Sequence, residues 1–142
     1  MRRLFLLTDK PRLLKKLKKL CGSSDSVSLC GYGEYGEMSF DSIHKLNPDI
    51  LLMSYSLPVE VEQHLVRFIH QCFPNIKMLI ISEQSDPQSA ESYLLSGAHG
   101  FIVERDLEEN LDQAIHLISK DGFFASDNIA NMIIEQRLKK TY

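Results

Sequence analysis

Four short apolar runs of this sequence each end in polar or charged side chains, and these are the residues best placed to do chemistry. They are Thr8, Asp9, Ser54, Ser82 and Glu104. A serine hydroxyl is a weak nucleophile at neutral pH and needs an adjacent base to activate it. Magnesium usually takes one or two protein carboxylates, and Asp9 is the only acid among Thr8, Asp9 and Ser54. We therefore assign no catalytic residue, no cofactor and no metal, with Asp9 as the only weak candidate for a metal ligand.

The apolar runs alternate with segments that have helical spacing, and this alternation predicts the fold. The expected strands are residues 4–7, 27–29, 49–53, 77–81 and 100–103. The expected helices lie within residues 11–20, 40–46, 61–72, 87–96 and 107–118, and the third has its apolar face at Val61, Leu65, Phe68, Ile69 and Cys72. This order predicts an α/β fold, a doubly wound five-stranded parallel sheet. Its strands would bring the polar residues to one edge, where ligands bind in such sheets.

Size, charge and cysteine content restrict the kind of protein. The chain has 142 residues, 44% of them hydrophobic, which suits one domain with one core. A net charge of −3 argues against a nucleic-acid surface over the whole domain. The apolar runs are far shorter than the roughly 20 residues that a membrane helix needs. Three cysteines leave one unpaired in any disulfide scheme, which favours a cytoplasmic protein.

Two motifs resemble those of a known family. Residues 48–58 begin with Pro-Asp, continue as a buried-strand pattern to Ser54, and reach Pro58 four residues later. Residues 97–104 contain Gly-Ala-His-Gly followed by Phe101. Across residues 3–121, the element order and these motifs resemble the CheY-like receiver domain of two-component response regulators, in the group with a LuxR-type helix-turn-helix output. The resemblance implies a flavodoxin-like fold.

The resemblance also implies a role for each polar residue, and it implies that the site is degenerate. Ser54 stands at the position of the phosphoacceptor aspartate, and Glu104 replaces the lysine that pairs with the phosphoaspartate. The remaining matches are the remnant acidic pocket, Thr8 and Asp9, and the switch positions, Ser82 and Phe101. Family members have two adjacent acids where this chain has Thr8 and Asp9. Phosphoryl transfer needs cations to neutralise its charge, so we expect no phosphorylation here.

These departures lead to a functional expectation. The chain is interpreted as an atypical, phosphorylation-independent receiver domain that acts in signal transduction and transcription regulation through protein contacts, and not as an enzyme. By resemblance we expect a homodimer; helices one and five form the dimer face in some members. Residues 1–121 would be the receiver-like domain, and residues 122–142 a linker helix toward an output domain absent from this sequence. DNA would be bound only through that output domain.

Alternative interpretations remain open from the sequence. The protein could be a stand-alone pseudo-receiver adaptor without DNA output. Gly31, Gly33 and Gly36 fit the Gly-x-Gly-x-x-Gly fingerprint of nucleotide-binding proteins, although the matching strand is the second of the sheet and the expected acid is missing further on. The first helix carries a dense basic face, which suits an acidic partner or simply a solvated surface. Its basic residues are Arg12, Lys15, Lys16, Lys18 and Lys19.

Overall fold

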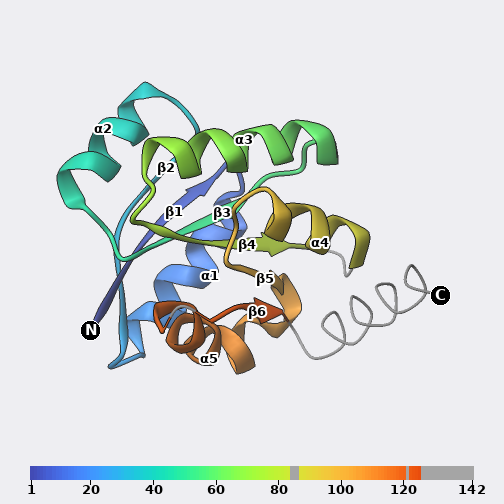
Figure 1. Ribbon diagram of the computed structural model, residues 1–142. Coiled ribbons are helices and arrows are strands. Elements are labelled where there is room, and N and C mark those ends of the chain that lie inside the picture. The colour runs from blue at the N-terminus through green and yellow to red at the C-terminus, as the bar shows by residue number, and fades with distance from the viewer. Residues whose placement is uncertain (84–86, 121, 126–142) are drawn as a thin grey trace.

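The computed structural model describes residues 1–83, 87–120 and 122–125. The strands are β1 (Arg2–Thr8), β2 (Val27–Gly33), β3 (Ile50–Ser54), β4 (Lys77–Ser82), β5 (Gly100–Val103) and β6 (Phe124–Ala125). The helices are α1 (Pro11–Gly22), α2 (Glu37–Leu46), α3 (Val59–Cys72), α4 (Pro87–Leu95), α5 (Leu107–Ser119) and the 3-10 helix η1 (Glu104–Asp106). The strands form one parallel sheet in the order β2-β1-β3-β4-β5-β6 (Figure 1). The predicted α/β, doubly wound parallel fold is confirmed.

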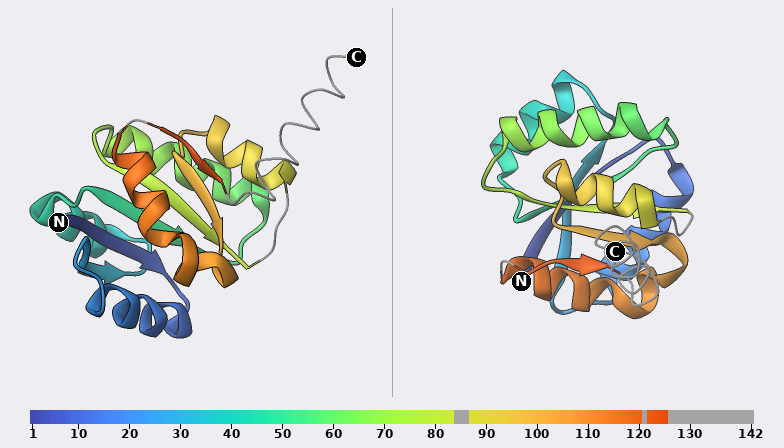
Figure 2. Two further views of the ribbon diagram at one scale, coloured as in Figure 1. Left: turned by 90° about the horizontal axis from the view of Figure 1, so that it is seen from below. Right: turned by 45° about the vertical axis from the view of Figure 1, so that its right-hand side comes forward.

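Helices cover both faces of the sheet because the strands β1, β3, β4 and β5 are apolar on both sides. Leu4 and Leu6 of β1 belong to the core that α1 and α5 cover, whereas Phe5 and Leu7 belong to the core under α2, α3 and α4 (Figures 1 and 2). All five residues of β3 are buried. Such continuous burial is typical of central strands in parallel sheets. The sheet is thus fixed by two cores, and its carboxyl edge carries the polar strand ends.

The sheet has one more strand than the five predicted. Among the described residues, β6 pairs in parallel with β5, with Phe124 in register with Gly100. Phe124 is only 6% exposed and belongs to the core under α1 and α5. Two residues are too few to show a strand period, which explains why the sequence did not reveal this element. The helix predicted within residues 122–142 falls almost wholly outside the described residues.

Of the five residues predicted for the apolar face of α3, only Ile69 is fully buried. Val66 and Ile69 are buried together with Glu62, whereas Val61 and Phe68 are each 45% exposed. The inward positions 62, 66 and 69 are spaced as one helical face, so the structure selects a face that includes an acid. The apolar stripe of the sequence therefore points largely to solvent.

The connection from α4 to β5, at the amino edge of the sheet, requires a glycine. Gly97 follows α4 with a φ of +121°, a conformation that favours glycine. A Cβ atom there would also lie 3.0 Å from the ring of His70.

None of the helices that the structure describes is both long and apolar enough to cross a membrane.

Candidate functional site

Two strand ends lie side by side at the carboxyl edge, as the topology predicts. Thr8 and Ser54 are register partners of β1 and β3, and their exposed fractions are 8% and 1%. The Thr8 hydroxyl donates a 2.7 Å hydrogen bond to the Ser54 carbonyl oxygen. Buried hydroxyls usually require such partners. The Thr8 side chain therefore ties β1 to β3 at the position where the family resemblance places a metal-holding acid.

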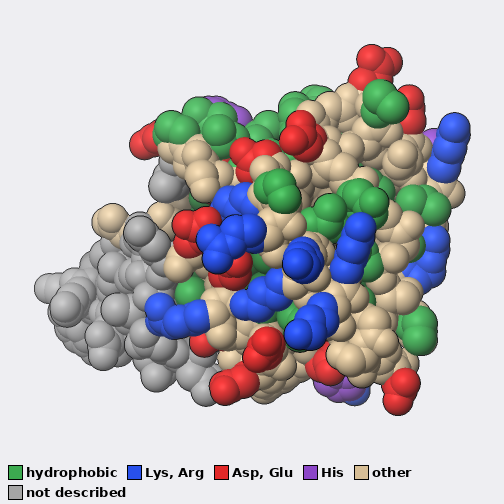
Figure 3. Space-filling model, turned by 180° about the vertical axis from the view of Figure 1, so that it is seen from behind, with side chains coloured by type: hydrophobic (Ala, Val, Ile, Leu, Met, Phe, Trp, Pro, Cys, Tyr) green, Lys and Arg blue, Asp and Glu red, His purple; other side chains and the backbone are tan. Residues whose placement is uncertain are grey.

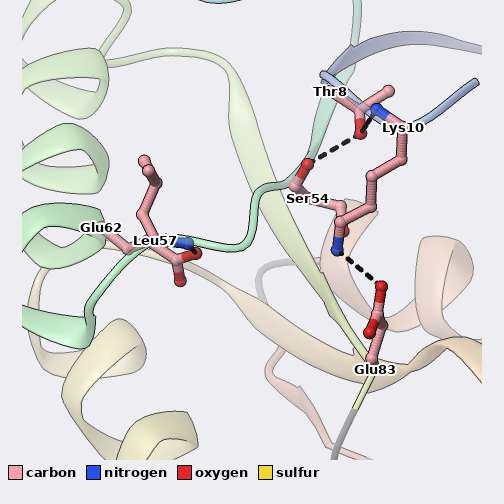
Figure 4. Close-up of polar contacts among 6 residues, drawn as sticks. All are labelled: Thr8, Lys10, Ser54, Leu57, Glu62 and Glu83. Atoms are coloured by element: carbon pink, nitrogen blue, oxygen red, sulfur yellow. Dashed lines mark hydrogen bonds and ion pairs between the residues drawn. The ribbon is translucent and has the colours of Figure 1, made fainter.

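A lysine that the sequence analysis did not single out reaches the centre of this edge. Lys10 lies in the loop after β1, and its Nζ atom is 3.1 Å from the Ser54 hydroxyl oxygen (Figure 4). The same Nζ atom is 3.3 Å from Oε1 of Glu83, which follows β4. The Lys10 backbone N–H donates to the Thr8 hydroxyl at 3.1 Å, which fixes the start of the loop. Lys10 thus brings a positive charge to Ser54, the residue that the resemblance places at the phosphoacceptor position.

The contact with Lys10 determines what the Ser54 hydroxyl can do. A lysine that is ion-paired with a carboxylate acts as a hydrogen-bond donor, and an ammonium group has no acceptor atom. The Lys10 ammonium group therefore donates a hydrogen bond to the Ser54 hydroxyl oxygen, and it cannot remove the proton of that hydroxyl. Serine becomes a nucleophile only beside a base. The observed arrangement is that of a satisfied buried hydroxyl.

The other predicted acidic site residues, Asp9 and Glu104, lie near Lys10 and do not surround Ser54. Asp9 is exposed, and together with Glu83 and Glu104 it lines a cavity of about 520 Å³ that also includes Lys10. Glu104 is half-buried in η1, and its carbonyl oxygen accepts a 3.0 Å hydrogen bond from Lys16 Nζ. In the described part of the chain, no three His, Cys, Asp or Glu residues are grouped to hold a metal ion. The acids are thus near one another but do not form a ligand set.

The two predicted switch positions lie at different depths. Ser82 ends β4, is half-buried and lines a cavity of about 300 Å³ that Lys10 also lines. Phe101 is fully buried in β5, and its ring stacks on that of Tyr93 with 5.9 Å between centroids and 19° between planes. The Tyr93 side chain is itself 4% exposed and lines the same cavity. The aromatic position is therefore packed inward beneath the site.

A buried acid, Glu62, is a second residue that the sequence analysis missed. Its side chain is 6% exposed, and Oε1 accepts a 3.1 Å hydrogen bond from the Leu57 backbone N–H (Figure 4). Burial raises the pKa of the Glu62 carboxyl, while the Leu57 N–H and the Lys10 ammonium lower it and Asp9 raises it. No sequence signal marked Glu62 as buried, because acidic residues on a helix normally face solvent.

The raised pKa of Glu62 predicts a pH-dependent cost to stability. An acid whose pKa is higher in the folded state holds its proton longer there, so its contribution falls as pH rises through the ordinary value of 4.5. Glu62→Gln keeps the oxygen that accepts from Leu57 and cannot ionise. The variant is expected to gain stability relative to the parent as pH rises, measured by urea unfolding below and above pH 4.5. A difference that is independent of pH would contradict this.

Two of the three glycines of the nucleotide-type fingerprint, Gly31 and Gly33, have packing roles. Gly31 and Gly33 lie within β2. A Cβ atom on Gly31 would lie 2.7 Å from the Phe5 ring, and one on Gly33 would collide with the Ser39 hydroxyl. These close approaches account for two glycines without a ligand.

The basic face predicted for the first helix is present on α1. Figure 3 shows Lys and Arg side chains gathered on one side of the molecule, with Asp and Glu along the border. Helix α1 has five basic residues and no acid. Lys16 is bonded to the Glu104 carbonyl, and Lys18 lies 4.4 Å from the centroid of the Tyr32 ring. The remaining charges of the face, Arg12, Lys15 and Lys19, are exposed.

Comparison with known proteins places this geometry among signalling proteins. No family model matches the chain. It is 21% identical over 131 residues to the transcriptional regulatory protein DegU of Brevibacillus brevis, covering 92% of this chain and 56% of DegU. It is 22% identical over 131 residues to the response regulator GacA of Pseudomonas viridiflava, covering 92% and 61%. The chain thus spans a little over half the length of these relatives.

Solved structures show the same fold. A LuxR-family two-component response regulator from Aurantimonas superposes with a TM-score of 0.83 at 22% identity, covering 97% of this chain and 99% of that one. A structure of two RcsB dimers bound to two parallel DNAs matches with a TM-score of 0.77 at 16% identity, covering 93% and 67%. At these identities the structural likeness establishes the fold, and the sequence relatives connect it with signalling. The chain therefore has the fold of receiver domains and is similar in sequence to response regulators of two-component systems.

Proposed function

We propose that this receiver domain acts without phosphorylation, in transcription regulation, through protein contacts. The observation that carries the proposal is the position of Lys10, whose ammonium group bridges Ser54 and Glu83 at 3.1 and 3.3 Å. It supplies a positive charge at the edge without a metal. A domain whose acceptor position is already occupied by its own side chains has no need of a phosphoryl group to hold its loops together.

Electrostatics at the edge support this proposal. A phosphoryl group in transfer carries negative charge that bound cations and lysines must neutralise. Here the ammonium group of Lys10 is paired with Glu83, and Glu104 adds a negative charge to a cavity that Arg12 and Asp9 also line. Ser54 would also have to act as nucleophile without a base. Each of these features opposes phosphorylation at Ser54.

The proposal predicts the result of a phosphorylation assay. Incubation with acetyl phosphate and Mg²⁺ is expected to leave the intact mass of the chain unchanged, because neither Ser54 nor Asp9 has the surroundings of an acceptor. A response regulator with an intact acceptor aspartate serves as the positive control in the same reaction. A stable phosphoryl adduct mapped to Ser54 or Asp9 would overturn the proposal.

We propose that DNA binding is the task of an output domain and not of this receiver domain. DegU is a transcriptional regulator, and the chain matches 56% of it. The solved RcsB structure contains dimers on DNA. By analogy, this domain would place its output domain through the association of two copies.

The face that α1 and α5 share is suited to such a homodimer. Both helices cover the same core, and Lys16 connects α1 with η1 at the start of α5. All five charged residues of α1 are basic, whereas the first turn of α5 has the exposed acids Glu108 and Glu109. A surface with one basic and one acidic half is self-complementary under a two-fold rotation. Two copies would therefore pair α1 of each with α5 of the other.

A further inference from the structure

A cavity at the carboxyl edge of the sheet combines buried apolar side chains with a buried acid. It has a volume of about 300 Å³ and lies between the loop after β3, the end of β4 and helix α4. The buried side chains that line it are Met53, Glu62, Ile80, Ile81 and Tyr93. Cavities that bind small molecules combine apolar walls with a few placed polar groups. The cavity therefore has the size and the lining of a site for a small ligand.

The carboxylate of Glu62 has fewer partners than a buried charge normally has. Its two oxygens can accept about four hydrogen bonds, and the described residues supply one, from the Leu57 N–H to Oε1 at 3.1 Å. Among the described residues, no lysine, arginine or histidine forms an ion pair with it. Buried charges are normally paired. The ionised carboxylate therefore lacks a cation, which agrees with the pKa that burial raises.

Lys10 lines the same cavity but does not supply that cation. Its Nζ atom lies 3.1 Å from the Ser54 hydroxyl oxygen and 3.3 Å from Oε1 of Glu83. Figure 4 shows the Lys10 side chain directed toward this pair, with Glu62 and Leu57 apart from it. The charge of Lys10 lowers the pKa of the Glu62 carboxyl by less than burial raises it. Because Lys10 is paired with Glu83, the charge of Glu62 is not balanced by the described residues of the lining.

The surroundings of Glu62 favour an organic ammonium group over a metal ion. Magnesium and calcium take several oxygen ligands, and the described part of the chain groups no three His, Cys, Asp or Glu residues for a metal. An ammonium group has three N–H donors and forms a strong hydrogen bond with a single carboxylate. Met53 and Ile80 offer apolar contacts to the rest of such a ligand. The rings of Tyr55 and Tyr93 line the cavity as well, and aromatic rings attract cations.

We propose that this cavity binds a small primary amine with an apolar body, whose ammonium group pairs with Glu62. The body of the ligand would lie against Met53, Ile80 and Tyr93. Because the Tyr93 ring stacks on Phe101, the ligand would contact the aromatic pair beneath the site. The inference goes beyond the proposed function, which requires no ligand and stands whether or not the cavity is filled.

The test is a titration of the full chain with benzylamine, followed by the backbone amide shifts in proton–nitrogen correlation spectra. Benzylamine is expected to give saturable shifts for residues that line the cavity, including Leu57. Benzyl alcohol has nearly the same shape but a neutral hydroxyl in place of the ammonium group. It is expected to bind at least about tenfold more weakly, because hydrogen bonds between charged groups are stronger than those of neutral groups.

Three variants assign the amine preference to Glu62 and the binding to the cavity. Glu62→Gln retains an oxygen for the Leu57 N–H and is expected to weaken benzylamine binding at least about tenfold, with benzyl alcohol binding unchanged. Glu60→Gln removes an exposed acid of the same helix that does not line the cavity, and it is expected to bind both compounds as the parent does. Ser89→Phe fills the cavity from α4 and is expected to abolish the binding of both. Circular dichroism checks that each variant is folded.

The results that contradict the proposal are specific. A parent that binds benzylamine and benzyl alcohol equally well would show that no charge is recognised. A Glu62→Gln variant that keeps the preference for the amine would show that another acid is responsible. A benzylamine titration without saturable shifts at the cavity would overturn the site itself. Each of these results would leave the acetyl phosphate prediction unaffected.

Discussion

Phe101→Ala is expected to lower the free energy of unfolding by about 3–5 kcal/mol, the usual cost of deleting a buried aromatic ring. The side chain is fully buried, and it stacks on Tyr93, which is 4% exposed. Removing the ring leaves a cavity between β5 and α4 that neither element can fill without moving. Because domains are stable by only about 5–15 kcal/mol, urea unfolding should show a much lower midpoint.

Phe123→Ala is the matched control for that substitution. Its side chain is 69% exposed and precedes β6, so the expected change is within about 0.5 kcal/mol. A loss below about 1 kcal/mol for Phe101→Ala would mean that the surrounding core closes over the missing ring. That outcome would show that the inward position of Phe101 is held weakly. A large loss would mean that the Phe101 ring is tightly packed in its buried position.

Most of the sheet could be predicted because its strands have strong local signals. Residues 4–7 and 50–53 are continuous apolar runs, and all of them are buried. The face of α3 was predicted only in part: Ile69 is buried as predicted, but Val61 and Phe68 are exposed and Val66 is buried in their place. Only the packing of α3 on the sheet decides which of them face the core. The sixth strand depends on pairing with β5 and has no periodicity of its own.

Like the sheet, the site could be predicted only where the order of the strands determines it. Parallel topology alone predicts that Thr8 and Ser54 meet at one edge, and the structure places them in register. The contact of Lys10 with Ser54 joins residues 44 positions apart and depends on the direction of a flexible side chain. No helical or strand period encodes such a direction. The sequence therefore predicted which strand ends meet at this edge, but not that the Lys10 ammonium group lies beside Ser54.

Ser54→Asp combined with Lys10→Met is expected to lower the free energy of unfolding by about 3–5 kcal/mol at neutral pH, the usual cost of a buried charge without its partner. Ser54 is 1% exposed, so a carboxylate there would be largely desolvated. Ser54→Asp alone should cost much less, because the Lys10 ammonium lies 3.1 Å from the position of the hydroxyl. Lys10→Met alone removes one hydrogen bond to a neutral hydroxyl and the ion pair with the exposed Glu83, at a cost of about 1 kcal/mol. The quantity to measure is the coupling energy of this double-mutant cycle.

The pH dependence of the double variant distinguishes a buried charge from a simple packing defect. Burial without a cation raises the folded-state pKa of the new carboxyl, so the variant loses stability as pH rises through the ordinary aspartate pKa of about 3.9 and regains it in acid. A packing defect would cost the same at every pH. A coupling energy near zero would mean that the Lys10 ammonium does not stabilise charge at position 54, and the proposal that Lys10 supplies the positive charge of this edge would fall with it. A coupling of about 2 kcal/mol or more would mean that a carboxylate at position 54 forms an ion pair with Lys10.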